Sequence, residues 1–522
     1  MRDLHTTRLH TAQQHVRNGR LDEANALLGA ILEAEPEHGD ALEGLGHIAA
    51  RRNDYASAAD YLDRAAAILP RAIERDYNAG HVNQCAGRYA QAIRHFARAL
   101  EQAPGHLPTL QAIVACLLQT EDYGQALHWL EQACAVSPQD FRIHYERGRV
   151  LGELGRHEEE IAAYQRSLAL RPDFVQGHVN LGVALRDLRR FDQALACFKA
   201  ALALDPDNAA ARTNRAQTNL LLGNFEHGWR DYEWRWRDGH QQHPFATPRW
   251  TGKEALNGKT LLVHAEQGFG DTLQFVRYLE PLAATGAQII LRVQAALLPL
   301  MQRYPGAAQV VAEDSPIPPH DYHCPLLSLP LALYRRAPQI PARTPYLFAD
   351  PARQAPWQGV FPDGDRRRRI GIAWSGSRTH LNDRNRSASL RDWAGLFAAD
   401  AQFVSLQKDV RPQDRAELQA HRHLIDLGPR LETFADTAAL VAQLDLIISV
   451  DTAIAHLAGA MAKPTWVLLP QLPDWRWQLD RVDSPWYPTA RLFRRTSSGS
   501  WHDLIQEVVQ ALADSPQETA NS

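Results

Sequence analysis

Two stretches of this sequence place residues capable of acid–base chemistry directly after short apolar runs. In the first, the run 260–265 leads into Gly268, Gly270 and Asp271, and a helix-like segment begins at Thr272. The two glycines permit a tight turn and the close approach of a ligand. The residues alone leave two roles open for Asp271. It caps the following helix, or its carboxylate removes a proton from an attacking hydroxyl group.

The second stretch joins an apolar run, 445–450, to a helix rich in alanine. Asp451, Thr452 and His456 follow the run. Small residues favour close packing of this helix on a sheet, which would direct its positive N-terminus at a ligand and suit a diphosphate. Asp451 would then accept hydrogen bonds from sugar hydroxyls. The structural alternative makes Asp451 an ordinary cap and His456 a core histidine with a hydrogen-bond partner.

Two further loops carry cations and small residues. Ser375 and Gly376 begin a loop with several arginines, of which we expect Arg386 to neutralise a diphosphate while backbone N–H groups bind its oxygens. Gln407 and Lys408 follow the next apolar run. For the loop that begins at Ser375, the competing interpretation is a solvated surface loop. For Lys408, it is an ordinary surface lysine.

Parallel strands are needed to bring these loops together. Apolar runs alternate with helix-length segments at 260–265, 287–293, 309–312, 369–374, 402–407, 424–427, 445–450, 465–469 and 491–493. This alternation predicts βαβ units that bind ligands at the carboxyl ends of their strands. We expect an α/β region with two Rossmann-like halves, 259–350 and 366–514, separated by a proline-rich linker and followed by a tail, 515–522. Such an architecture is similar to the glycosyltransferase fold called GT-B.

The first part of the chain repeats every 34 residues. One proline marks each repeat: Pro36, Pro70, Pro104, Pro138, Pro172 and Pro206. Helix-turn-helix units of this length resemble the tetratricopeptide repeat, with glycines in the first helix that let the paired helices pack closely. Residues 1–237 are therefore expected to form an α-solenoid with a concave groove. Aromatic residues at its end, with the linker 238–258, would cap it against the next domain.

The composition and charge of the chain limit the classes of partner that we expect. The formal net charge of −4 gives no reason to expect nucleic acid, and the most apolar stretch, 446–469, contains charged residues that argue against a membrane span. The N-terminus lacks the apolar core of a secretory signal, and the five cysteines show no CxxC spacing, so we expect buried thiols in a cytoplasmic protein. Neither α/β half contains a convincing Asp-x-Asp motif, since the pattern at 363–365 lies in the linker, and we expect neither metal nor cofactor.

The segments 267–271 and 451–456 resemble the two signature segments of glycosyltransferase family 9, the lipopolysaccharide heptosyltransferases. The resemblance implies a GT-B enzyme that inverts configuration without a catalytic metal. It makes Asp271 the general base and implies that Asp451, Thr452 and His456 contact a nucleotide sugar. Ala453 stands where the family has glycine, and Arg386 takes the place of its phosphate-binding lysine.

The whole layout resembles bacterial tetratricopeptide glycosyltransferases and, more distantly, O-linked N-acetylglucosamine transferase, in which an asparagine ladder holds the peptide backbone. Asn78, Asn180 and Asn214 share one repeat position here, and Tyr145 precedes that position in another repeat. The resemblance implies that the three asparagines contact a peptide acceptor, and a helix face that also carries Tyr145 favours the same kind of acceptor.

We therefore expect an inverting glycosyltransferase that moves a sugar from a nucleoside diphosphate donor, its substrate, to a polypeptide held by the repeats. Two alternatives stay open. One is a repeat-based interaction protein that has lost turnover, and the other is an enzyme that acts on glycan or lipid acceptors. The sequence leaves the donor base, the sugar and the acceptor unidentified.

Overall fold

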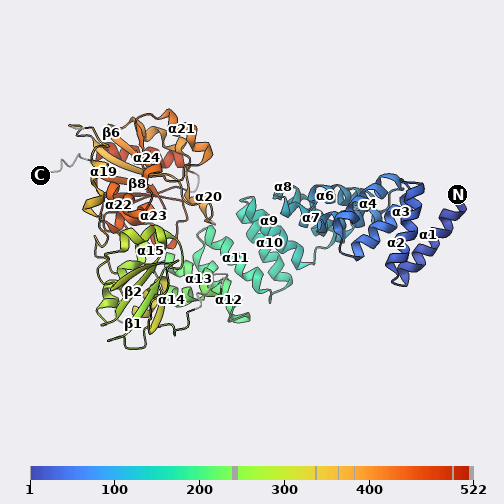
Figure 1. Cartoon of the computed structure of the whole chain (residues 1–522), viewed down its shortest axis with the longest axis horizontal. Helices are drawn as coiled ribbons and strands as arrows, with labels where there is room; N and C mark the ends of the chain where they lie inside the picture. The colour runs from blue at the N-terminus through green and yellow to red at the C-terminus, as the bar shows by residue number, and fades with distance from the viewer. Residues whose placement is uncertain are drawn as a thin grey trace. The chain divides into compact units, whose positions relative to one another are not determined.

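The computed structural model describes residues 2–237, 245–334, 338–362, 364–380, 382–496 and 499–515. The chain divides into two compact units, Met1–Asn208 and Ala209–Ser522 (Figure 1). The first unit is helical, and the second combines helices with two parallel sheets. The predicted fold class, a repeat solenoid followed by an α/β region, is confirmed.

Each repeat of the first unit is a pair of helices joined by a short turn. The pairs are α1 (Arg2–Arg17) with α2 (Leu21–Ala34), α3 (Gly39–Arg51) with α4 (Tyr55–Ile68), α5 (Ile73–Cys85) with α6 (Tyr89–Gln102), α7 (Leu107–Gln119) with α8 (Tyr123–Val136), α9 (Phe141–Glu153) with α10 (His157–Leu170), and α11 (Val175–Asp187) with α12 (Phe191–Leu204). The recurring prolines lie just beyond the second helix of each pair, where a missing N–H costs no helical hydrogen bond.

Glycines set the spacing within the pairs. A Cβ atom added at Gly80 would lie 2.6 Å from the Phe96 ring, and one added at Gly182 would lie 2.5 Å from the Phe198 ring. Such contacts are too short for any side chain, so glycine is what lets the two helices of a pair pack face to face. This confirms the interpretation of the recurring glycines.

The turn inside each pair has a left-handed residue at one repeat position. These residues, again 34 apart, have φ between 58° and 74°: Gly19, Asn53, Gly87, Glu121, Gly155 and Arg189. A left-handed residue closes the carboxyl end of the first helix and reverses the chain. The geometry recurs even where the residue is not glycine, because the packing of the pair imposes it.

The seventh repeat belongs to the second unit. It consists of α13 (Ala209–Leu221), α14 (Phe225–Tyr232) and the short helix η1 (Glu233–Trp236). The ring centroid of Trp229 lies 5.2 Å from that of Trp475 and 6.0 Å from that of Phe275, so the aromatic residues pack on the α/β region as expected of a cap. Residues 238–244 of the predicted linker lie outside the described residues.

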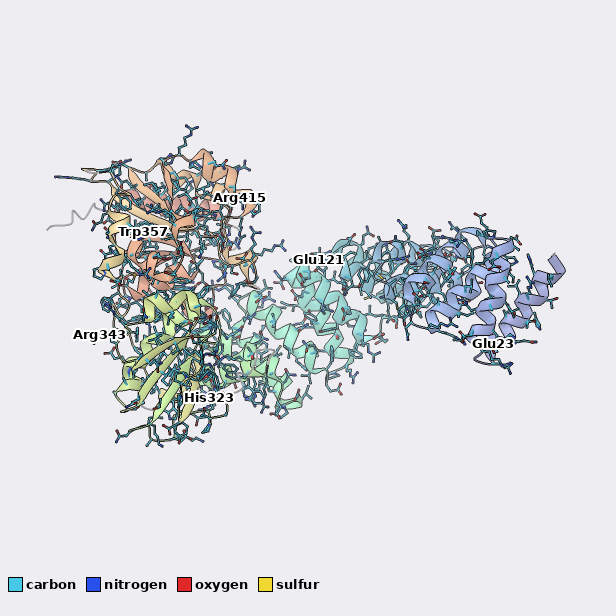
Figure 2. All side chains as sticks on the ribbon, viewed as in Figure 1. Glu23, Glu121, His323, Arg343, Trp357 and Arg415 are labelled. Carbon is cyan, nitrogen blue, oxygen red and sulfur yellow. The ribbon has the colours of Figure 1, made fainter. Side chains whose placement is uncertain are left out.

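The first sheet is parallel, with the order β3-β2-β1-β4. Its strands are β1 (Thr260–His264), β2 (Gln288–Val293), β3 (Gln309–Ala312) and β4 (Tyr322–Pro325). Strand β4 was not predicted, because its four residues include a histidine and a proline and lack an apolar pattern. Register places Leu262 between Ile290 of β2 and His323 of β4, the latter labelled in Figure 2.

The second sheet has six parallel strands in the order β10-β9-β8-β5-β6-β7. They are β5 (Arg368–Ala373), β6 (Ala401–Ser405), β7 (Leu424–Asp426), β8 (Leu446–Val450), β9 (Thr465–Leu469) and β10 (Ala490–Arg494). Counted within this half, the order is 3-2-1-4-5-6, the doubly wound arrangement in which the order of successive strands reverses between β5 and β8. Ligands bind such sheets at the carboxyl ends of the two strands that flank this point.

Helices and short 3-10 turns connect the strands. In the first half they are α15 (Phe269–Phe275), η2 (Val276–Tyr278), α16 (Leu279–Ala283), η3 (Ala295–Leu297), α17 (Leu298–Met301), η4 (Leu326–Ser328) and α18 (Leu329–Leu333). In the second they are α20 (Asp383–Arg386), η6 (Leu390–Ala398), η7 (Pro412–Asp414), α21 (Arg415–Ala420), η8 (Gly428–Arg430), α22 (Phe434–Val441), α23 (Ala453–Ala460), η9 (Trp475–Trp477) and α24 (Trp501–Asp514).

The predicted linker, 350–365, is folded into the second half. It contains η5 (Pro351–Arg353) and α19 (Ala355–Gln358), and the side chains of Trp357 and Phe361 are buried in a core cluster with Leu440. Asp363 of the Asp-x-Asp pattern lies outside the described residues.

Two expectations from composition concern membrane-spanning helices and the burial of the cysteines. None of the helices in the described ranges is long and apolar enough to cross a membrane. Cys116 and Cys324 are buried as expected, but Cys85 is exposed at the end of α5, where the helix surface faces solvent.

Candidate functional site

Asp451 and Thr452 lie at the carboxyl end of β8, beside the point where the strand order reverses. Thr452 is the N-cap of α23, and its Oγ1 accepts a hydrogen bond from the N–H of Ile454 at 3.3 Å. The Ser449 hydroxyl lies 2.9 Å from the same oxygen. Thr452, rather than Asp451, therefore caps the helix. The Asp451 carboxylate is left for another role, with its side chain only 11% exposed.

The loop after β5 lies on the other side of this point, and Gln407 fixes its start. The side-chain oxygen Oε1 of Gln407 accepts hydrogen bonds from the N–H groups of Trp374 and Ser375 at 3.2 and 3.1 Å. Gln407 is buried, so the geometry gives it a role in shaping the loop. The Oγ of Ser375 is buried without a hydrogen-bond partner among the described residues.

Arg386 joins the two strand ends. Its Nη1 donates a hydrogen bond to the backbone oxygen of Asp451 at 3.1 Å, and a Cβ at Gly376 would lie 2.6 Å from its Nη2. The Nε atom lies 4.0 Å from the carboxylate of Asp383 and makes no hydrogen bond in the described structure. Gly376 is thus the residue that lets this guanidinium pack against the backbone, and the two predicted donor-site loops meet here.

Arg411 and Asp383 are part of this cluster, although the sequence analysis did not select them. The Nη2 of Arg411 donates to the Asp383 carboxylate and to the Ser387 hydroxyl. Lys408, by contrast, is exposed and donates to the backbone oxygen of Glu432 at 2.9 Å. The structure brings Arg386 to the strand ends, whereas Lys408 is held against a different loop.

Asp271 does not cap its helix in the expected way. Helix α15 begins at Phe269 rather than Thr272, its N-cap is Gly268, and Asp271 occupies the third helical position. Asp271 Oδ2 accepts a hydrogen bond from the Gly268 N–H at 2.9 Å, while Oδ1 forms an ion pair with Arg476. Both oxygens of the predicted base are therefore engaged.

Arg476 is buried and links α15 to the loop that follows β9. Besides Asp271, it donates through Nε to Gln274 Oε1 and through Nη1 to Asp474 Oδ1, both at 2.8 Å. Burial disfavours its charge, but Asp474 and Asp271 outweigh this effect and raise the pKa of Arg476. The guanidinium thus stays charged. The sequence analysis missed Arg476 because it follows β9 only after an irregular loop.

His456 packs between the two halves of the α/β region. Its Nδ1 lies 2.9 Å from the Tyr487 hydroxyl, and its ring stacks on Trp477 with centroids 5.3 Å apart. A Cβ at Gly270 would lie 2.8 Å from His456 Cδ2. Burial lowers the pKa of His456 to about 3, and Arg476 contributes to this shift, so the imidazole is neutral at physiological pH.

Asp451 has an environment that favours its protonated form. Burial is the main cause and the nearby carboxylate of Asp474 adds to it, raising the pKa of Asp451 to about 6. Its Oδ1 lies 3.9 Å from His456 Nε2. A carboxyl group that is protonated in part near neutral pH repels a bound phosphate less than a full charge does.

Glu266 and His264, the neighbouring acid and base on the same turn, have structural partners. Both oxygens of Glu266 accept hydrogen bonds from Arg235 Nη2, at 2.7 and 3.0 Å, and the two side chains are 2% and 1% exposed. His264 Nε2 lies 3.4 Å from His323 Nδ1. The Glu266–Arg235 pair joins the seventh repeat to the first sheet.

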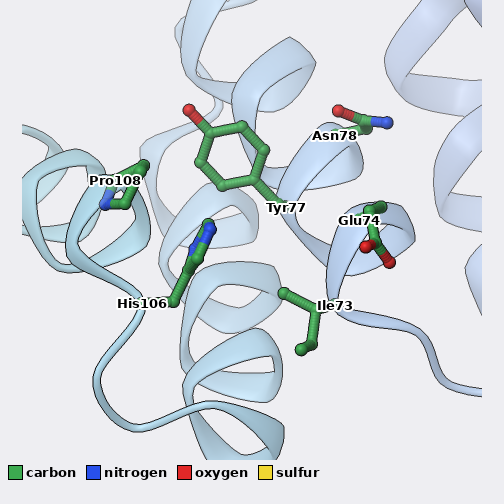
Figure 3. Close-up of a pocket in the computed structure, with 6 residues that line it drawn as sticks. All are labelled: Ile73, Glu74, Tyr77, Asn78, His106 and Pro108. Carbon is green, nitrogen blue, oxygen red and sulfur yellow. The ribbon is translucent and has the colours of Figure 1, made fainter.

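The repeat residues expected to hold an acceptor differ in their surroundings. Asn78 lines a hollow of about 350 Å³ in the first unit with Tyr77, His106 and Pro108 (Figure 3). Asn180 Nδ2 instead donates to the Tyr145 hydroxyl at 3.0 Å, across successive repeats. Asn214 belongs to the second unit and donates to the backbone oxygen of Ala210.

Potential metal ligands gather in one place among the described residues. His5, Glu35 and His38, in the first unit, bring ligand atoms within 4.8 Å of one another. In the candidate site, three carboxylates form ion pairs with three arginines: Asp271 and Asp474 with Arg476, and Asp383 with Arg386 and Arg411.

Fold and site together define a tetratricopeptide-repeat protein with a two-sheet α/β domain, whose candidate site lies at strand carboxyl ends. Four tetratricopeptide-repeat models match residues 10–73, 86–149, 141–174 and 175–208. The model described as glycosyltransferase family 9 (heptosyltransferase) matches residues 403–478. That match includes Asp451, His456 and Arg476. The protein thus combines a repeat array with a segment that is similar to this glycosyltransferase family.

Several known proteins are similar to the whole chain or to part of it. Protein FlbA of Caulobacter vibrioides is 27% identical over 527 residues, covering 94% of this chain and 87% of its own length. Superkiller complex protein 3 of Homo sapiens is 25% identical over 126 residues, 23% of this chain and 8% of that protein. Among solved structures, MamA from Desulfovibrio magneticus RS-1 is 25% identical over 33% of this chain and 96% of its own, with a TM-score of 0.30. YrrB, titled a TPR protein with an unusual peptide-binding site, is 20% identical over 35% of this chain and 95% of its own, with a TM-score of 0.31.

Proposed function

We propose that this protein is an inverting, metal-independent glycosyltransferase of the GT-B type that transfers a sugar from a nucleoside diphosphate donor. One observation carries the donor assignment. At the reversal point of the second sheet, the Arg386 guanidinium packs against Gly376 and donates to Asp451, beside the N-terminus of α23. A helix N-terminus and a partly buried arginine at this place in a doubly wound sheet suit a diphosphate.

The sugar and its acceptor have candidate partners around this point. Asp451 and Thr452 supply oxygens for sugar or ribose hydroxyls, and the buried hydroxyl of Ser375 is open to a further hydrogen bond. Asp271 is the proposed general base, from the facing half. His456, neutral and stacked on Trp477, serves mainly to hold α23 and α15 together, so that the base stays close to the donor.

The acceptor is proposed to be a polypeptide bound by the repeats. Asn78 is the strongest candidate for a backbone contact, because it lines an open hollow beside Tyr77. Tyr145 and Asn180 already satisfy one another, and they would present their remaining groups as a pair. A cytoplasmic location is kept as part of this proposal.

A donor screen tests the proposal. Uridine, guanosine, adenosine and thymidine diphosphates are compared by thermal shift, and a ligand at 100 times its Kd stabilises the protein by about 2.7 kcal/mol. Arg386→Gln is expected to abolish the shift. Arg367→Gln is the matched control, because Arg367 is paired with Asp365 on the surface and should leave the shift unchanged. Absence of a shift with all four nucleotides contradicts the donor assignment.

A repeat-based interaction protein without turnover is the second candidate. The observation that favours it is the ion pair of Asp271 with Arg476, which occupies the proposed base. Slow hydrolysis of the matching nucleotide sugar separates the two functions. An enzyme releases free sugar at a rate that falls with Arg386→Gln, whereas a binding protein releases none.

A further inference from the structure

Arg476 is a charged residue for which the proposed reaction has so far no role. Its side chain is 9% exposed and makes contacts with Asp271, Gln274 and Asp474. Two of these partners, Asp271 and Gln274, lie on α15 of the first half, and Asp474 lies in the loop after β9 of the second half. The guanidinium therefore lies between the proposed base and the carboxyl edge of the second sheet.

Contacts along this edge connect Arg476 with the proposed donor site. The next residue, Trp477, stacks on His456, and His456 Nε2 lies 3.9 Å from Asp451 Oδ1. Asp451 in turn accepts a hydrogen bond from Arg386 through its backbone oxygen. Two arginines, Arg386 and Arg476, thus flank Asp451, a distribution of positive charge that suits the two phosphates of a donor.

The present partners of Arg476 conflict with catalysis by Asp271. A general base needs a free oxygen within hydrogen-bond reach of the acceptor hydroxyl. Here Oδ2 accepts the Gly268 N–H, and Oδ1 is paired with Arg476. The Gly268 bond stabilises the first turn of α15, so the bond to Arg476 is the one whose loss leaves the helix intact.

We propose that Arg476 is a further donor-binding residue, and that the donor diphosphate and Asp271 compete for its guanidinium. This inference rests on the proposed function. Without a donor, Arg476 holds Asp271 in an ion pair. A diphosphate, with more charge and more acceptor oxygens than one carboxylate, takes the arginine and frees Oδ1 of Asp271. Donor binding therefore prepares the base, and the acceptor reacts second.

The transfer step balances in charge and atoms. Asp271 takes the proton of the acceptor hydroxyl, and the hydroxyl oxygen forms a bond to the anomeric carbon. The bond from that carbon to the phosphate oxygen breaks, and the nucleoside diphosphate leaves with the electron pair. Arg476 and Arg386 stabilise the charge that develops on the leaving group.

If Asp271 and the donor diphosphate compete for Arg476, substitution of Asp271 should change nucleotide affinity, whereas a purely structural ion pair predicts no such change. Removing the charge of Asp271 should strengthen nucleoside diphosphate binding, because the free protein no longer has to break the ion pair. By isothermal titration calorimetry of the full chain with the four nucleoside diphosphates, we expect Asp271→Asn to bind the selected nucleotide about three- to tenfold more tightly than wild type. Arg476→Gln should bind it about tenfold more weakly.

A matched control variant separates the loss of the ion pair from the loss of any helix-capping carboxylate. Asp503→Asn alters a carboxylate in the same helical position of α24, where it accepts the Ser500 N–H but pairs with no arginine in the described structure, and should leave affinity unchanged. Misfolding cannot mimic tighter binding, so Asp271→Asn remains informative if Arg476→Gln is unstable. Equal or weaker binding by Asp271→Asn, with wild type binding normally, overturns this inference alone. Failure of wild type to bind any of the four nucleotides overturns the proposed function as well.

Discussion

Gly270 and His456 pack closely against each other where the two halves of the α/β domain meet at the candidate site. The space at Gly270 where a Cβ would stand lies 2.8 Å from His456 Cδ2 and 3.7 Å from the Cα of Ala453. His456 cannot easily move away, because it is bonded to Tyr487 and stacked on Trp477. The glycine next to the proposed base is therefore required by packing, whatever contact it makes with a ligand.

We expect Gly270→Ala to lower the free energy of unfolding by about 1–3 kcal/mol, the usual cost of overpacking a filled interior. The measurement is urea unfolding followed by tryptophan fluorescence. Gly359→Ala is the control, because an added Cβ there meets no atom within 4 Å. In combination with His456→Ala, the cost of the alanine at position 270 should largely disappear, since the imidazole it collides with is gone. Additive costs in the double variant contradict the contact.

The stability contributed by Asp451 should depend on pH. Its pKa is raised from 3.8 to about 6 in the folded state, so the folded protein retains this proton over a range where the unfolded chain has lost it. Below about pH 4 the Asp451 carboxyl group is protonated in both states and costs no stability. As pH rises toward 6 the unfolded chain loses this proton first, and the free energy of unfolding falls. Asp451→Asn should therefore exceed wild type by an amount on the order of 3 kcal/mol at pH 7.5 and by little at pH 4. A difference that stays constant with pH is the contrary result.

Asp271 and Glu266 should respond to substitution in opposite ways. With the donor selected by the screen, Asp271→Asn is expected to lower kcat about 100- to 10,000-fold while the protein stays folded, because the amide keeps the turn but cannot take the proton. Glu266→Ala should instead destabilise the fold by about 3–5 kcal/mol, since it removes the buried counter-ion of Arg235 and leaves only the more exposed Glu233. Circular dichroism melts and initial rates distinguish the two. A stable Glu266→Ala protein without activity would transfer the role of base to Glu266.

The boundary of the catalytic part should lie before the seventh repeat. A protein that starts at residue 209 retains α13, α14 and the buried Arg235–Glu266 pair, so we expect it to fold and to bind the donor diphosphate without transferring sugar to a macromolecule. A protein that starts at residue 238 loses Trp229, Tyr232 and Arg235 and should aggregate. Cooperative unfolding of both proteins, observed by calorimetry, contradicts the assignment of this repeat to the second unit.

The repeat array and the strand order were accessible from the sequence because both depend on local patterns. A proline and a small residue every 34 positions indicate a helical pair that packs on its neighbours. All nine of the predicted apolar runs coincide with strands in the structure. Asp451 and Thr452 were found for the same reason, since a polar residue after a buried strand necessarily lies at the edge of a parallel sheet. The strand β4 was not found, because four residues with a histidine and a proline carry no periodic signal.

Only the tertiary structure decided which of the selected side chains meet. Lys408 and Arg386 look equally suitable in the sequence, yet Lys408 is held by Glu432 while Arg386 reaches Asp451. Arg476 lies 205 residues from Asp271 along the chain, and no local pattern reports that they pair. The sequence by itself determined the elements and the strand ends, because hydrophobic periodicity and chain breaks act over a few residues. The partners of each charged group depend on how two separate halves pack, and that information is spread over the whole domain.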